Sequence, residues 1–135
     1  MTDIRLIDVD PVTRLVSFRT SSKTLSGIDE LIQIVVLSLL NTPGKDVLHP
    51  NKGGGISELV RYNMTEANEM FTEVASRVSK TEQEIIEDQV GLNLNPETKL
   101  RKINIRYVKQ GDTEDTILVG LQIVNERGRI AEVTI

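Results

Sequence analysis

Residues 102–135 read KINIRYVKQGDTEDTILVGLQIVNERGRIAEVTI, and this stretch decides the fold class. Apolar side chains take alternate positions in three runs: Ile103, Ile105 and Tyr107; Ile117, Val119, Leu121 and Ile123; Ala131, Val133 and Ile135. Such alternation is typical of half-buried strands, and the polar segments Gln110–Thr113 and Asn125–Gly128 indicate turns between them. The sequence therefore predicts a three-stranded antiparallel meander over residues 99–135, whose last strand runs to Ile135.

Two segments upstream have the spacing of amphipathic helices. Residues 28–40 carry apolar side chains at intervals of three and four, which predicts a helix with Ser26 as its N-cap. Thr-Pro-Gly at residues 42–44 is expected to end it. Ile34 and Leu37 lie off the apolar stripe, so we expect this helix to be covered by the sheet on one side and by a second surface, such as a partner, on the other.

The second helix is predicted from residues 67–78, which repeat the same spacing after a capping Thr65. Beyond this segment two interpretations stay open. Thr81 and Glu84 have the spacing of a capping box that would begin a new helix, whereas Ile85 continues the apolar stripe. We favour a helix that continues through Thr81, either straight or with a kink there.

This order of elements shows no regular alternation of strand and helix, so an α+β fold is expected rather than a parallel α/β sheet. We predict two main helices packed on a mostly antiparallel sheet with a C-terminal three-stranded meander. One domain, residues 1–135, is expected. Its parts are an N-terminal arm with short strands (1–25), a helical part (26–90) and the C-terminal strands (99–135).

Composition limits the classes of function. A formal charge of −4 has the wrong sign for a sequence-independent grip on nucleic acid, and 3% aromatic residues offer few rings for stacking on bases. The chain has no cysteine, which excludes disulfides and thiolate catalysis. Acidic residues interrupt the first ten positions, so no signal peptide is expected, and no apolar run approaches the roughly 20 residues of a membrane span.

Three features could carry chemistry, and each is better explained structurally. The glycines at residues 53–55 follow Lys52 instead of preceding a lysine, which favours a tight turn over a phosphate-binding loop. His49 is the only histidine and has no accompanying nucleophile motif. The acidic residues around Glu82 are better explained as a solvated face than as a glycosidase pair, since twenty carboxylates place some pair at such a separation by chance. We therefore predict no catalytic, cofactor-binding or metal-binding residues.

A specific motif links the first helix to the glycine turn. Leu40-x-Thr42-Pro43-Gly44 is followed, after a spacer, by Pro50-x-x-Gly53-x-Gly55-Ile56-x-x-Leu59. This structural turn motif resembles the baseplate wedge family of contractile-tailed phages, a sheath-initiator family that is also labelled lysozyme-like and occurs in tailocins and type VI secretion baseplates. The resemblance extends more loosely over residues 26–135.

The resemblance implies a non-enzymatic subunit without cofactors that links the baseplate wedge to the tail sheath and templates the first sheath ring by strand addition. The implied sheath-facing strand edge is Ala131, Glu132, Val133, Thr134 and Ile135. Family members often carry a Glu-Pro-Arg tripeptide after the second helix; Glu82, Gln83 and Glu84 stand nearest to it and are the candidates for docking to the wedge. The implied partners are sheath and wedge proteins, with several copies of this chain around the tail axis. The implied location is the virion baseplate, assembled in the host bacterial cytoplasm.

Alternatives remain at this level. The lysozyme-like label and the acidic residues 82–88 leave open a peptidoglycan-degrading tail lysozyme, and a cytosolic adaptor unrelated to tails is a third class. An edge position of the last strand would leave unpaired N–H and C=O groups for a strand from another chain, as β-augmentation requires. The other arrangement pairs that strand on both sides within the domain.

Overall fold

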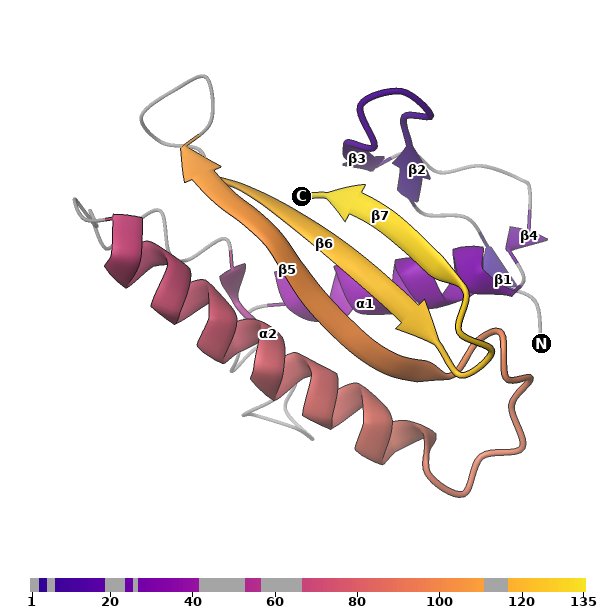
Figure 1. Ribbon diagram of the computed structural model, residues 1–135. Coiled ribbons are helices and arrows are strands. Elements are labelled where there is room, and N and C mark those ends of the chain that lie inside the picture. Colours follow the sequence, from indigo (N-terminus) through magenta and orange to yellow (C-terminus); the bar gives the residue numbers. More distant parts are fainter. Residues whose placement is uncertain are drawn as a thin grey trace.

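The computed structural model describes residues 3–4, 7–18, 24–25, 27–41, 53–56, 67–110 and 117–135. The helices and strands of these segments are, in chain order, β1 (Asp3–Ile4), β2 (Ile7–Val9), β3 (Val16–Phe18), β4 (Thr24–Leu25), α1 (Ile28–Leu40), α2 (Ala67–Gln89), β5 (Leu100–Gln110), β6 (Ile117–Asn125) and β7 (Ile130–Thr134). The predicted α+β class is confirmed, with two helices and a C-terminal antiparallel meander (Figure 1).

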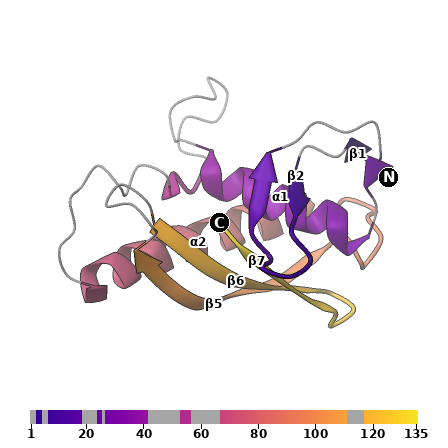
Figure 2. The same cartoon turned by 90° about the horizontal axis from the view of Figure 1, so that it is seen from above.

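The main sheet has the strand order β5-β6-β7, with each neighbouring pair antiparallel. Both helices lie on one face of it, where α1 packs under β6 and β7 and α2 runs along β5 (Figures 1 and 2). The N-terminal strands form two small antiparallel pairs, β1 with β4 and β2 with β3. The β2–β3 hairpin lies beside the end of β7 (Figure 2).

The hydrophobic core fills the space between the helices and the sheet. Its buried members are Ile, Leu and Val with one Ala, as the low aromatic content predicts. Leu31 and Val35 of α1, Val74 of α2 and Leu121 and Ile123 of β6 have no exposed surface. Burying one such aliphatic side chain contributes about 1.5–3 kcal/mol, so the two layers are held together mainly by this contact.

The helices follow the predicted periodicity, with two corrections, one at the start of α1 and one within α2. The N-cap of α1 is Gly27, with a φ of 63°, and not Ser26, which lies outside the described residues. The capping-box interpretation of Thr81 is wrong, because α2 continues without a break to Gln89. Thr81 is completely buried and shares the core-facing side with Val78 and Ile85, so packing against the sheet decides the helical state here.

The predicted orientation of Tyr107, on the same side of β5 as Ile103 and Ile105, is also wrong. Ile103 and Ile105 face the core, but a register shift follows, since Ile105 pairs with Leu121 and Tyr107 pairs with Gly120. Arg106 is therefore an extra residue of β5 without a partner on β6, which is a β-bulge. Because each extra residue reverses the facing of those that follow, the ring of Tyr107 lies on the open face, away from both helices.

Candidate functional site

The predicted sheath-facing segment, residues 131–135, lies in β7 up to Thr134 and continues it by one residue, and β7 is the edge strand of the main sheet by strand order. Its last residue pairs closely with β6: Ile135 donates to the carbonyl of Val119 over 2.9 Å, and Val119 donates to that of Ile135 over 2.8 Å. Bonded positions alternate in an antiparallel pair. The N–H and C=O groups of Ile130, Glu132 and Thr134 therefore point away from β6, along the outer edge.

Part of this outer edge is occupied by the chain itself. The N–H of Thr134 donates to the carbonyl of Arg14 over 2.9 Å, and Nε of Arg14 donates to the carbonyl of Glu132 over 2.8 Å. Leu15 and Thr134 form a parallel bridge at the same place. No described residue hydrogen bonds to the N–H of Glu132 or to the N–H and C=O of Ile130. The edge is thus closed at its C-terminal end and open at its start.

A hollow of about 410 Å³ lies next to the open end of this edge, between β7 and the first turns of α1. Ile28, Ile32 and Ala131 contribute apolar surface to it. Its charged lining residues are two of each sign, Arg14 and Arg129 against Asp29 and Glu132. A strand added to β7 would direct alternate side chains toward α1, that is, toward this hollow.

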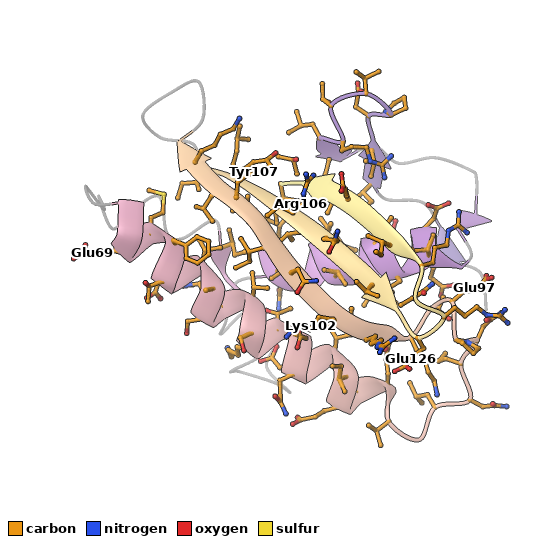
Figure 3. The ribbon with its side chains drawn as sticks, viewed as in Figure 1. Glu69, Glu97, Lys102, Arg106, Tyr107 and Glu126 are labelled. Atoms are coloured by element: carbon orange, nitrogen blue, oxygen red, sulfur yellow. The ribbon has the colours of Figure 1, made fainter. Side chains whose placement is uncertain are left out.

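The open face of the sheet is polar and tightly arranged around Tyr107. The hydroxyl of Tyr107 lies 2.7 Å from Oγ1 of Thr134, and its ring covers Gly120 on the strand between them. A Cβ atom on Gly120 would stand 2.3 Å from a ring carbon, so only glycine fits there. Arg106, which Figure 3 labels beside Tyr107, pairs with Glu132 over 2.8 Å. These contacts tie β5 to β7 across β6.

The glycine turn, residues 53–55, is built into the core between the helices. The N–H of Gly54 donates to the carbonyl of Ser38 over 3.0 Å, and that of Gly55 to the carbonyl of Asn41 over 2.9 Å. A Cβ on Gly53 would stand 2.3 Å from the carbonyl oxygen of Asn41. The close approach of the end of α1 is therefore the physical reason for glycine here.

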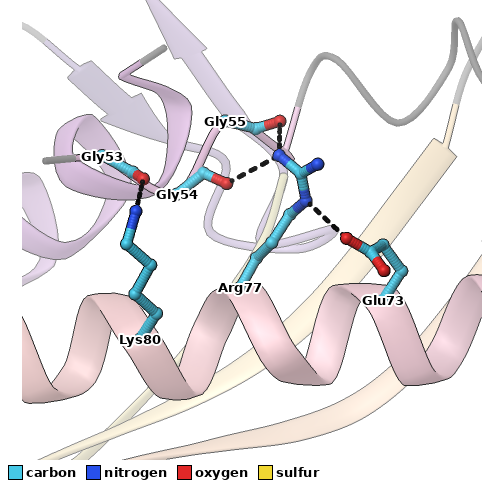
Figure 4. A network of polar contacts seen from close by, with 6 residues as sticks. All are labelled: Gly53, Gly54, Gly55, Glu73, Arg77 and Lys80. Atoms are coloured by element: carbon cyan, nitrogen blue, oxygen red, sulfur yellow. Dashed lines mark hydrogen bonds and ion pairs between the residues drawn. The ribbon is translucent and has the colours of Figure 1, made fainter. Parts of the chain in front are cut away.

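Side chains of α2 hold the other side of this turn (Figure 4). Nζ of Lys80 donates to the carbonyl of Gly53 over 3.2 Å. One guanidinium nitrogen of Arg77 donates to the carbonyls of Gly54 and Gly55 over 3.1 and 2.8 Å. Since the glycine N–H groups bond within the chain and the cations face the glycine carbonyls, this turn presents no anion cradle.

The remaining residues of the turn motif, Thr42, Pro43, Gly44 and Pro50, lie outside the described residues, as does His49.

The docking candidates Glu82, Gln83 and Glu84 are separated by the helix. Glu82 accepts from the N–H of Ile103 over 2.9 Å and pairs with Lys102 over 3.3 Å, which closes one position on the outer edge of β5. Glu84 accepts from the N–H of Gly53 over 3.3 Å and pairs with Lys80 over 3.6 Å.

Gln83 alone of these three side chains is exposed, and its Nε2 donates to a carboxylate oxygen of Glu87 over 3.5 Å. Two of the three docking candidates thus have internal partners. The two glutamates also bind different segments of the chain, β5 and the glycine turn, instead of converging on one substrate position.

Arg14 and Arg77 are the residues of this region that sequence reasoning missed. The sequence patterns assign no role to either arginine. The spacing of charges along α2 contains Arg77, but its glycine partners come from another segment of the chain, so no local pattern reveals the contact.

The described segments contain no group of three or more His, Asp or Glu side chains that could hold a metal ion. Neither α1 nor α2 is long and apolar enough to cross a membrane. Comparison of the chain with protein-family models, with curated proteins and with solved structures found no match.

Proposed function

We propose that this chain is a structural, non-enzymatic subunit of a contractile-tail baseplate, which links the wedge to the sheath and templates the first sheath ring by strand addition to β7. The turn motif around Gly53 and Gly55 supports the proposal through its resemblance to the baseplate wedge family. The observation that carries it is that, within the described segments, nothing hydrogen bonds to the N–H of Glu132 or to the N–H and C=O of Ile130 on the outer edge of β7.

Strand addition follows from the chemistry of such an edge. Unpaired backbone groups in a row accept an extended segment, which gains main-chain hydrogen bonds along the strand. The edge is already ordered by β6 and by the core, so at its open start an incoming arm bears mainly its own ordering cost. A ring of such subunits would lower the barrier to starting a sheath. In this proposal several copies surround the tail axis in the virion, after assembly in the bacterial cytoplasm.

The substitution Glu132→Pro tests the role of the edge directly. Proline has no N–H, and its ring would fill the space from which the N–H of residue 132 points outward. Pairing with β6 does not use this N–H, so the meander is expected to fold, as edge strands tolerate proline at such positions. Deletion of residues 131–135 would be less direct, because it also removes Val133 from the core.

Glu132→Ala is the matched control, because it removes the ion pair with Arg106 and keeps the N–H. The measurement is co-expression with a candidate sheath protein, followed by electron microscopy. We expect baseplates with Glu132→Pro to carry little sheath and those with Glu132→Ala to carry a normal amount. Sheath of normal length on both would refute strand addition at β7.

A further inference from the structure

The tip of the β2–β3 hairpin closes half of the edge on which the proposed function depends. Two hydrogen bonds come from Arg14: its carbonyl accepts from the N–H of Thr134, and its Nε donates to the carbonyl of Glu132. Leu15 adds a parallel bridge to Thr134. These two groups of β7 are also among those that an added strand would need. A full-length strand and Arg14 therefore compete for the same positions.

The backbone at Arg14 is strained. Its φ is 59°, and it is the only described non-glycine residue with a positive φ. A left-handed backbone conformation is unfavourable for arginine because of its Cβ atom, and glycine does not have this cost. Glycine is therefore the usual residue at such a position in a hairpin. Arginine gains something here that glycine cannot supply, namely the side-chain bond to Glu132.

The hairpin is otherwise well anchored. Ile7 is buried, and Val9 and Val16 pack against the core. Asp10 accepts hydrogen bonds from the N–H groups of Val12 and Thr13, and Leu15 is 45% exposed. The tip can therefore leave β7 while the base of the hairpin stays in place.

We propose that Arg14 and Leu15 form a latch, which protects the edge of β7 in the free subunit and is displaced by the incoming strand. The proposal rests on the proposed function, since it assigns the regulation of that same edge. Displacement replaces the two hydrogen bonds of Arg14 with two hydrogen bonds to the added strand. The net change in free energy at these two positions is therefore expected to be close to zero. The hairpin then keeps free subunits from pairing edge to edge, which is the ordinary hazard of an exposed edge strand.

Hydrogen exchange tests the latch without any partner. The N–H of Thr134 is held by Arg14, whereas the N–H of its neighbour Val133 faces β6. We expect Thr134 to exchange at least tenfold faster than Val133, through a local opening that low denaturant concentrations do not change. Equal rates with equal dependence on denaturant would show that the tip opens only with the whole domain, and would overturn the latch.

A disulfide tests the consequence for assembly. Leu15 and Thr134 are bridge partners, and the chain has no cysteine, so Leu15→Cys with Thr134→Cys introduces a single disulfide. The probe is purified monomeric tail-sheath protein, added to the oxidised and to the reduced form. Both forms have the same sequence, so a folding defect of the substitutions would affect them equally. We expect the oxidised form to bind at least tenfold less sheath.

The outcomes separate the two proposals. Equal binding by the oxidised and the reduced form would overturn the latch and leave strand-mediated sheath binding standing. Binding by neither form, when the unsubstituted chain also fails to bind, would overturn the proposed function and the latch with it. As an independent support, Arg14→Gly keeps the left-handed turn but loses the bond to Glu132, and is expected to bind sheath about threefold to tenfold more tightly.

Discussion

Arg77→Met tests the contribution of the guanidinium to the glycine turn. Methionine keeps most of the apolar stem of the side chain and removes the charge and all donors. The substitution leaves the carbonyls of Gly54 and Gly55 without the nitrogen that now lies 3.1 and 2.8 Å away. Both glycines are buried, so water cannot readily replace it.

The expected cost follows from these two bonds. A hydrogen bond to a charged group contributes about 1.5–3 kcal/mol, and a buried acceptor left unpaired costs a similar amount. Because one nitrogen serves both carbonyls, the two bonds do not add fully, and we expect a loss of about 3 kcal/mol in the free energy of unfolding. For a domain of this size the corresponding fall in Tm is about 10 °C.

Urea denaturation and differential scanning calorimetry measure this loss. The matched control is Glu73→Gln, which removes the ion pair between Arg77 and Glu73, whose side chain is 43% exposed. Such an exposed pair contributes little, so the control is expected to stay within about 1 kcal/mol of the unsubstituted chain. A fall in Tm under about 2 °C for Arg77→Met, or an equal fall in the control, would refute the role assigned to the glycine carbonyls.

Two further predictions concern the open face and the hairpin. Gly120→Ala is expected to destabilise the domain by about 1–3 kcal/mol, since its Cβ would meet the ring of Tyr107, and a double-mutant cycle with Tyr107→Ala should recover most of that loss in urea denaturation. The hydrogen bonds that Thr13 and Val12 donate to Asp10 lower the pKa of its carboxyl below the ordinary value near 3.9, so the stabilisation of the hairpin turn is complete above that value and is lost as the pH falls through the lowered pKa. An NMR titration of the Val12 and Thr13 amide shifts should show a midpoint below 3.9, and Asp10→Asn should abolish it.

Much of the fold was predictable because its signals are local. Three- and four-residue spacing marked α1 and α2, and alternation marked β5, β6 and β7, since each pattern reflects which side of one element meets the core. The face of Tyr107 was not predictable in this way. It depends on a bulge at Arg106, which arises only when β5 is aligned with β6.

The candidate site likewise has a part that local sequence patterns predicted and a part that they could not predict. The sequence predicted a last strand that reaches the C-terminus, but its neighbours decide whether that strand lies at an edge. The latch joins Arg14 to Glu132, 118 positions later in the chain, and no periodicity connects two residues so far apart. Likewise, the pattern around Glu82 and Glu84 was that of a solvated or docking surface, whereas packing directs both side chains to internal N–H groups.

Taken alone, the order of residues established an α+β chain with an aliphatic core, two amphipathic helices and a C-terminal meander. It could do so because the periodicity of apolar side chains is a local property of each helix or strand. Tertiary structure decided which backbone groups remain unpaired, which side of β5 carries Tyr107, and that an arginine from the N-terminal hairpin closes half of the β7 edge. Hydrogen bonds between distant segments depend on how the elements are placed in space, and placement is a property of the packed molecule rather than of any one segment.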